Sequence, residues 1–155
     1  MPSPTHCASV VVPAPAATAF EFMADGLRQS HWALGSMERR DLGDGLFVGT
    51  SSWDGKELYV RLVSDSELML VDYYVGPSPD ALRFGVTVRV MDGAAIGQGA
   101  DHSMITLTQW RTPDTPDDAW ERESHVWPTE IQLIKSRIEH EVAIGLLPLA
   151  ANGAS

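Results

Sequence analysis

Short runs of alternating apolar and polar residues fill the middle of the chain, between residues 36 and 111. This period of two places successive side chains on opposite faces of a β-strand. Asp-Gly pairs at 44–45 and 54–55 separate neighbouring runs and favour tight hairpin turns, which need positive φ angles. With a β-branched segment near the N-terminus, the pattern predicts seven antiparallel strands: residues 6–12, 36–43, 46–53, 56–64, 67–75, 82–91 and 101–111.

Helical periodicity marks the two ends of the chain. Residues 15–26 predict a helix after the first strand, and residues 27–35 predict a second, short helix. The longest helical pattern covers residues 120–145. Because proline is awkward inside a helix, either the main helix starts at Pro128 or a preceding helical piece kinks there. We expect it to span at least Glu130 to Glu141, with one apolar stripe: Trp127, Ile131, Ile134, Ile138 and Val142.

The predicted order of elements is one strand, two helices, six strands joined by hairpins, and one long helix. An antiparallel sheet with one apolar face must bury that face against another element, and the terminal helix is the only long amphipathic segment available. We therefore predict an α+β fold in which a curved seven-stranded antiparallel sheet wraps around the C-terminal helix. A strongly curved sheet around one helix tends to leave a cavity, which is a natural place for a small molecule.

Hairpin register determines which side chains face that helix. If Asp54-Gly55 and Asp65-Ser66 are both two-residue turns, Val60 pairs with Gly49 and with Val71. The inward set is then Phe47, Gly49, Ser51, Trp53, Leu58, Val60, Leu62, Met69, Val71, Tyr73 and Val75. The last two strands continue it with Leu82, Phe84, Val86, Val88 and Val90, and with Ser103, Ile105, Leu107 and Gln109.

The second strand has two possible registers. One points Arg40 inward, and a slip of one residue points Arg39 inward instead. An arginine faces the helix side in both. It either reaches solvent at the sheet edge, as unpaired charged residues usually do, or anchors a ligand carboxylate or carbonyl.

Charge restricts the classes of partner. The chain has 155 residues, with 21 acidic and 11 basic side chains and a formal net charge of −10. Nucleic acids and anionic membranes both attract clustered Lys and Arg, so the composition disfavours both. One cysteine, Cys7, cannot form an internal disulfide, and no apolar run is long enough for a membrane span. We expect a cytoplasmic monomer or homodimer with one domain at residues 1–145 and a tail at 146–155.

Familiar catalytic motifs do not occur in the sequence. The five histidines lack metal-ligand spacing, and no Gly-x-Ser-x-Gly elbow is present, so we predict no metal and no serine-hydrolase site. The glycines of residues 93–99 follow a strand but open no helix, so we read them as a hairpin loop and predict no cofactor. Tyr73 is the most informative inward residue. A buried phenol needs a partner, which is either a backbone group, Gln109 or a ligand.

The element order and the final helix resemble the SRPBCC superfamily, which has the START-like or birch-pollen-allergen-like helix-grip fold. Within it, residues 125–141 are similar to the closing segment of the heat-shock-ATPase-activator-like branch, where a Gly-Trp-Pro start leads into a helix with Leu-Lys and Leu-Glu pairs. Val126 stands here in place of the Gly, and isoleucine twice replaces leucine. The matching residues are Trp127, Pro128, Ile134, Lys135, Ile138 and Glu139.

This resemblance implies a hydrophobic cavity between the sheet and the C-terminal helix, with Trp53 and Trp120 near its mouth. We expect the cavity to bind a small, largely hydrophobic or aromatic molecule. Two alternatives remain open: a polyketide cyclase/aromatase-like or dehydratase-like enzyme that uses the same cavity, and a chaperone-interacting domain. The candidate ligand-binding residues are Trp32, Arg40, Ser51, Trp53, Tyr73, Phe84, Gln109, Trp120, Trp127 and Ile131.

Overall fold

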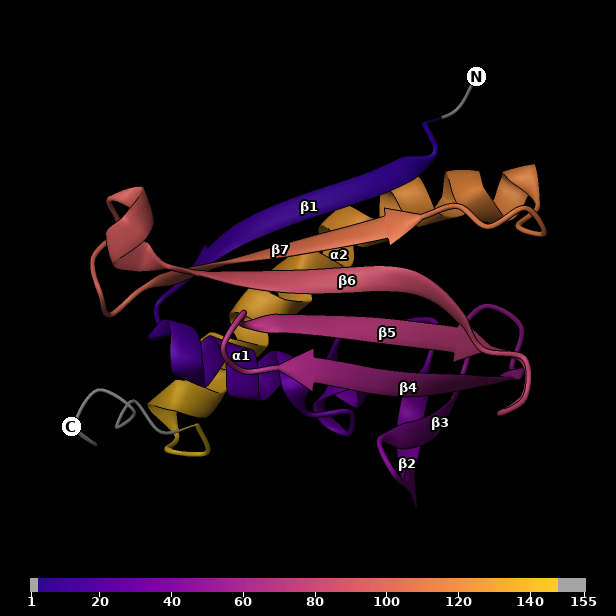
Figure 1. Ribbon diagram of the computed structural model, residues 1–155, viewed down its shortest axis with the longest axis horizontal. Helices are drawn as coiled ribbons and strands as arrows, with labels where there is room; N and C mark the ends of the chain where they lie inside the picture. The colour runs from indigo at the N-terminus through magenta and orange to yellow at the C-terminus, as the bar shows by residue number, and fades with distance from the viewer. Residues whose placement is uncertain (1–2, 148–155) are drawn as a thin grey trace.

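A computed structural model describes residues 3–147 and shows one seven-stranded antiparallel sheet with a long C-terminal helix (Figure 1). The strand order is β1-β7-β6-β5-β4-β3-β2, so β1 joins the meander beside β7. The predicted fold class is confirmed. The elements are β1 (Thr5–Val12), α1 (Ala16–Ala24), the 3-10 helix η1 (Arg28–His31), β2 (Met37–Gly43), β3 (Leu46–Thr50), β4 (Glu57–Asp65), β5 (Leu70–Gly76), β6 (Arg83–Asp92), the 3-10 helix η2 (Gly93–Ile96), β7 (Ser103–Trp110) and α2 (Asp117–Ala143).

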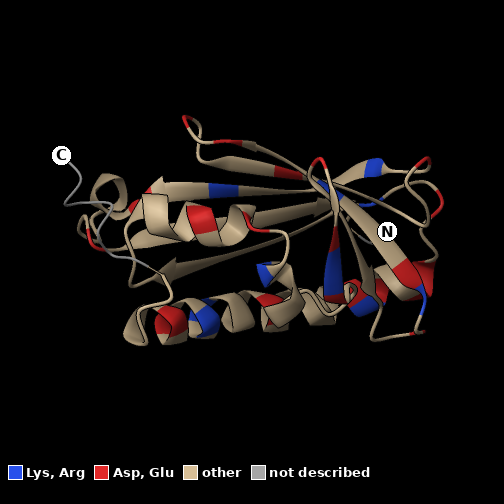
Figure 2. Ribbon diagram, turned by 90° about the horizontal axis from the view of Figure 1, so that it is seen from below, with Lys and Arg blue, Asp and Glu red and all other residues tan. Residues whose placement is uncertain are grey.

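Both α-helices lie on the same side of the sheet, as Figure 2 shows from below. The stripe of α2 that faces the sheet is the predicted one, because Ile131, Ile134 and Ile138 are all buried. Removing these side chains from water is the main favourable contribution to this packing. The opposing sheet residues are equally buried and form one core with the stripe: Val60, Val71, Val88, Ile105 and Leu107.

Helix α2 runs without interruption through Pro128. The first alternative is wrong, because the helix starts well before the proline, at Asp117; the helical piece that the second alternative expects before Pro128 is present and is continuous with the main helix. Proline donates no backbone N–H, so the carbonyl four residues earlier, at Ser124, loses its helical partner. Pro128 is exposed, which leaves that carbonyl near solvent.

The three predicted hairpin turns have different outcomes. Asp44-Gly45 is a two-residue turn with positive φ at both positions, as predicted. The other two turns are longer, because Thr50 pairs with Glu57 and Asp65 pairs with Leu70. Both errors displace the pairing by an even number of residues. The inward faces of β3, β4 and β5 are therefore preserved, whereas Ser51 and Trp53 move into the loop after β3.

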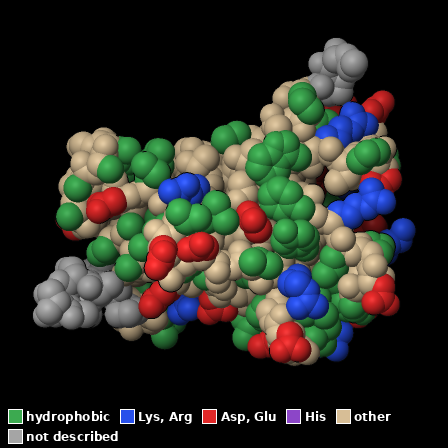
Figure 3. All heavy atoms as spheres, viewed as in Figure 1, with side chains coloured by type: hydrophobic (Ala, Val, Ile, Leu, Met, Phe, Trp, Pro, Cys, Tyr) green, Lys and Arg blue, Asp and Glu red, His purple; other side chains and the backbone are tan. Residues whose placement is uncertain are grey.

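Two β-bulges overturn predicted orientations. Tyr73 pairs with Val86 but Tyr74 pairs with Phe84, so Gly85 is an extra residue and Phe84 turns to the outer face of the sheet. There Phe84 is 43% exposed and lies between Tyr74 and Trp110. Figure 3 looks onto this outer face, where hydrophobic side chains gather over β5, β6 and β7.

The second bulge lies in β2, where the pairing jumps from Met37 with Thr50 to Arg40 with Val48. Glu38 adopts a φ of 53°, a left-handed conformation that makes room for the extra residue. Arg39 consequently points into the interior and Arg40 points to solvent. The register that points Arg40 inward is thus wrong, and the slipped register describes the structure.

The helix predicted at residues 27–35 shortens to the single turn of η1, after which the chain crosses to β2. At the other end, Leu147 packs into the core with 2% exposure. Residues 148–155 of the predicted tail lie outside the described residues. In the part of the chain that the structure describes, no helix is both long and apolar enough to cross a membrane.

Candidate functional site

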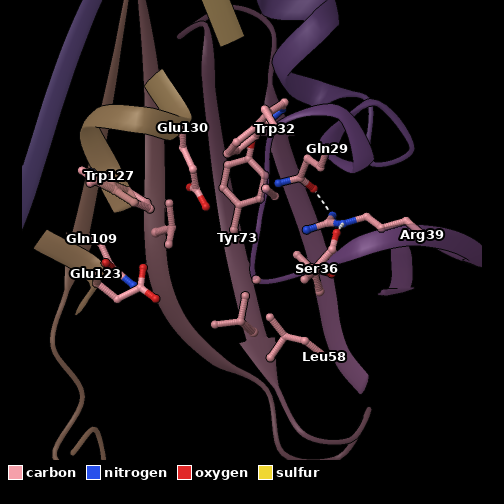
Figure 4. Close-up of a pocket in the computed structure, with 15 residues that line it drawn as sticks. Gln29, Trp32, Ser36, Arg39, Leu58, Tyr73, Gln109, Glu123, Trp127 and Glu130 are labelled. Atoms are coloured by element: carbon pink, nitrogen blue, oxygen red, sulfur yellow. Dashed lines mark hydrogen bonds between the residues drawn. The ribbon is translucent and has the colours of Figure 1, made fainter. Parts of the chain in front are cut away.

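A cavity of about 140 Å³ lies between the sheet, helix α2 and the segment that joins α1 to β2 (Figure 4). Three groups of residues enclose it. The sheet contributes Leu58, Val60, Tyr73, Val75, Val86 and Gln109. The segment around η1 and the start of β2 contribute Gln29, Trp32, Ala33, Gly35, Ser36 and Arg39, and α2 contributes Glu123, Trp127 and Glu130.

Tyr73 forms the centre of the sheet wall. It pairs across the strands with Val86, which in turn pairs with Gln109, so these three residues form one row. The phenol donates a hydrogen bond of 2.7 Å to the Met23 carbonyl in α1. Of the partners expected for this phenol, the backbone group is therefore the one found. Burial raises the pKa of Tyr73, so the phenol stays protonated and its ring lines the cavity.

Three residues of α2 face the cavity because they are spaced by four and three positions, one helical face: Glu123, Trp127 and Glu130. Glu130 is 5% exposed, and its Oε1 accepts the Leu34 N–H at 3.0 Å. Burial, and then the neighbouring Glu123 charge, raise the pKa of Glu130 to about 8 against the opposing effects of the Leu34 N–H and Arg39. Burial also raises the pKa of Glu123.

Arg39 supplies the cavity with a positive charge held among neutral acceptors. Its Nε donates to the Ser36 carbonyl at 3.2 Å, and one terminal nitrogen donates to the Gly26 carbonyl and to Gln29. The Arg39 backbone N–H donates to the Ser30 hydroxyl, which fixes the bulge. Burial lowers the pKa of Arg39 to about 10, so the guanidinium remains charged at neutral pH.

Four buried polar atoms around the cavity have no hydrogen-bond partner in the described protein: Trp32 Nε1, Ser36 Oγ, Gln109 Oε1 and Trp127 Nε1. An unsatisfied buried polar group costs about 1–3 kcal/mol, so folded proteins seldom keep several together. All four atoms lie around one cavity, where a polar group of a bound molecule could pair with them.

The cavity continues into an outer hollow of about 320 Å³, which shares Gly35, Leu58 and Glu123 with it. Trp53 lines this mouth with 41% of its surface exposed. The Arg122 guanidinium of α2 lies 5.1 Å from the centre of the Trp53 ring. A ligand larger than the cavity would therefore extend towards Trp53.

The structure brings six of the ten predicted candidates to the cavity or its mouth. Trp32, Tyr73, Gln109 and Trp127 line the cavity, and Ser51 and Trp53 line the mouth. Ile131 lies in the core with the apolar stripe and is not among the lining residues.

Three candidates lie elsewhere. Arg40 is exposed and forms an ion pair with Glu57 at 3.2 Å. Phe84 lies on the outer face because of the bulge at Gly85. Trp120 is buried beneath β1, where its ring stacks on His6 and its Nε1 donates to the Ser3 carbonyl. None of the three lines the cavity.

The sequence pattern did not predict five of the polar lining residues: Gln29, Ser36, Arg39, Glu123 and Glu130. Arg39 appeared only as the alternative to Arg40. A usable signal existed for the two glutamates, because their spacing from Trp127 places them on the edge of the apolar stripe. Charged residues at such positions usually extend to solvent, so spacing alone favours the wrong interpretation.

Comparison with known proteins gives matches only among solved structures, since no family model and no curated protein matches the chain. The Zhui aromatase/cyclase from Streptomyces sp. R1128 is 18% identical, with a TM-score of 0.63 over 89% of this chain and 94% of that one. The di-domain aromatase/cyclase BexL is 14% identical, with a TM-score of 0.66 over 89% of this chain and 47% of that one.

A START superfamily protein from Mycobacterium smegmatis is 11% identical, with a TM-score of 0.65 over 88% of this chain and 97% of that one. Identities this low carry information about architecture, and all three matched structures extend over nearly the whole described chain. The chain therefore shares its fold, a curved antiparallel sheet around a long C-terminal helix, with these three structures.

Proposed function

We propose that this protein binds a small aromatic molecule in the cavity between the sheet and α2. The observation that carries the proposal is the coincidence of an aromatic-walled cavity with four buried polar atoms that lack partners. Apolar walls with a few convergent polar groups are typical of small-molecule sites. The polar groups would orient the ligand while Trp32, Tyr73 and Trp127 supply contact area.

The cavity volume limits the part of the ligand that fits inside. A cavity of about 150 Å³ accommodates one benzene ring. The cavity of about 140 Å³ therefore suits a single ring, and the rest of the ligand would occupy the mouth near Trp53.

A second candidate function is an enzyme of the cyclase or dehydratase type. The observation that favours it is a buried carboxyl whose pKa of about 8 keeps a proton at neutral pH, which suits a general acid. Glu123, Arg39 and Gln109 converge on the same cavity. Chemical alteration of a bound compound, lost in Glu130→Gln, would favour this function over simple binding.

The test of binding uses a matched pair of valine substitutions. Val86 lines the cavity from β6, whereas Val63 lies two strands away, on β4, with 52% exposure. Val86→Phe should fill the cavity and abolish saturable calorimetric binding of 2-phenylethanol, while Val63→Phe should leave binding unchanged. Native mass spectrometry of freshly purified wild type should also show a co-purified small molecule that Val86→Phe lacks.

Two results would reject the proposal. One is the absence of saturable binding of phenylethyl probes together with an unliganded native mass. The other is equal binding by wild type and Val86→Phe, because the ligand would then occupy a different surface.

A further inference from the structure

We infer that the ligand carries a basic nitrogen, and that Glu123 and Glu130 bind it as an ammonium group where the cavity meets its mouth. This inference rests on the proposed binding function and specifies the chemical class of the ligand.

The charges that line the cavity do not balance. Two carboxyl groups, Glu123 and Glu130, face one guanidinium, Arg39. Arg39 donates to carbonyl and amide oxygens and forms no ion pair among residues 3–147. Neither glutamate forms an ion pair in that part of the chain, and Glu130 accepts only the Leu34 N–H. Among the residues that line the cavity, one negative charge is therefore unmatched whenever both carboxyls ionise, and Arg122 acts on Glu123 from outside this lining.

The surroundings of the carboxyls suit a cation. The Trp32, Tyr73 and Trp127 rings line the same cavity, and aromatic faces attract ammonium groups. In Figure 4, Glu130 projects between Trp127 and Tyr73. Gln109 contributes a buried carbonyl oxygen without a partner, and an ammonium has three N–H donors to distribute among such acceptors.

Ser36 also indicates a preformed polar site. This side chain is almost completely buried, lines the cavity, and leaves its hydroxyl without a partner. Ser36 comes from the segment that joins η1 to β2 and Glu130 comes from α2, so the unsatisfied groups are not confined to one acidic helix face. A ligand that enters between them would meet acceptors on both sides.

Ligands of other charge fit less well. An anion would face two carboxyls, and the guanidinium that could attract it already donates to three neutral oxygens. A neutral ligand would bring no positive charge to Glu123 and Glu130, so one of the two carboxyls would stay protonated. Glu123 lines both the cavity and the mouth. If a ring occupies the cavity, an ammonium group one or two carbons from that ring would lie beside Glu123.

Binding of a cation should displace a proton. In the empty site, burial and Glu123 keep Glu130 largely protonated at neutral pH. The charged groups that act on the pair are Arg39 from β2, Arg122 from α2 and His6 from β1. Affinity for the ammonium should therefore rise from pH 6 to pH 8, as Glu130 loses its proton.

The experiment compares three probes that share one ring and a two-atom tail: 2-phenylethylamine, 2-phenylethanol and phenylacetate. Calorimetry at pH 7.5 should give the amine about tenfold tighter binding than the alcohol, as one charge-assisted hydrogen bond provides. Phenylacetate should bind most weakly. Titrations in buffers of different ionisation enthalpy should show proton release with the amine and none with the alcohol.

Variants identify the groups responsible. Glu130→Gln keeps an oxygen that can accept from Leu34, and Glu123→Gln changes a less buried position. Each should reduce the amine preference several-fold while alcohol binding stays near the wild-type value. Glu121→Gln removes the same charge from an exposed position of the same helix and should keep the full preference.

The outcomes separate the inference from the proposed function. Equal binding of amine and alcohol by wild type would overturn the inference and leave the binding function intact. Tightest binding of phenylacetate would also overturn it and would identify Arg39 as the anchor. No binding of any probe would remove the proposed function as well.

Discussion

The two walls of the cavity differ in how completely their polar groups are satisfied. The sheet wall is mostly apolar; its tyrosine donates to the Met23 carbonyl, and Gln109 Oε1 is its one unpaired polar atom among the described residues. The opposite wall, built by α2 and the segment around η1, holds Arg39, Glu123 and Glu130 together with an unpaired serine hydroxyl. The difference indicates that the sheet gives the cavity its shape and that the helix side gives it chemical selectivity.

The same difference appears in the energetics. Burial of the apolar wall stabilises the fold, whereas a carboxyl such as Glu130 is costly to ionise in the interior. Positions that break the ordinary rule of burial without an evident structural gain are where function is expected. Separate substitutions should therefore change stability and selectivity independently.

The largest expected effect is on stability and comes from the apolar stripe beneath the sheet. Ile138→Ala removes a fully buried side chain, and emptying such a site should lower the free energy of unfolding by about 2–5 kcal/mol. Chemical denaturation measures this change. Ile144→Ala, at a position 55% exposed just past the end of α2, is the matched control and should change it by less than about 0.5 kcal/mol.

Ile138 is not among the cavity-lining residues, so the ratio of amine to alcohol affinity should stay at the wild-type value in Ile138→Ala, measured where the variant is folded. An altered ratio would contradict the separation of the two walls. Unchanged stability would show that the stripe is not the packed face of α2.

The next effect concerns the pH dependence of stability. The pKa of Glu130 is about 8 in the folded state and about 4.3 in an unfolded chain. Between these values the folded state binds more protons than the unfolded state, so stability falls as pH rises. A shift of one pKa unit corresponds to about 1.4 kcal/mol, so the free energy of unfolding should fall by a few kcal/mol between pH 5 and pH 8.

Glu130→Gln should remove this fall, because glutamine does not titrate. Denaturation of wild type and variant at a series of pH values measures the difference, with Glu121→Gln as the control that should keep the wild-type slope. A slope that persists in Glu130→Gln would assign the titration to another group, such as Glu123.

The sheet wall was predictable from sequence because alternation survives errors in loop length. The two hairpin loops that are longer than predicted displace the pairing by even numbers, so Val60, Tyr73 and Val75 keep the predicted face. A prediction made from alternation does not survive a β-bulge. One extra residue at Gly85 turns Phe84 outward, and the bulge at Glu38 turns Arg39 inward in place of Arg40.

The helix-side wall could not be predicted in the same way. Glu130 and Glu123 occupy helical positions that ordinarily extend to solvent, and the segment that buries Glu130 carries Leu34, almost a hundred residues earlier. Ser36 and Gln29 belong to irregular backbone with no periodic pattern. Their burial depends on long-range packing, which local spacing does not encode.

The smallest effect comes from Tyr73→Phe, which tests the sheet wall alone. The sequence left open whether this phenol contacts a ligand, and the structure gives its hydrogen bond to the Met23 carbonyl. Removing the hydroxyl should therefore lower the free energy of unfolding by about 0.5–1.5 kcal/mol, the usual net contribution of one neutral hydrogen bond. The ring remains, so the affinities for the alcohol and the amine should both stay within about twofold of wild type. A selective loss of alcohol binding would show that the phenol turns from Met23 to the ligand, and the sheet wall would then share the selectivity assigned here to the helix side.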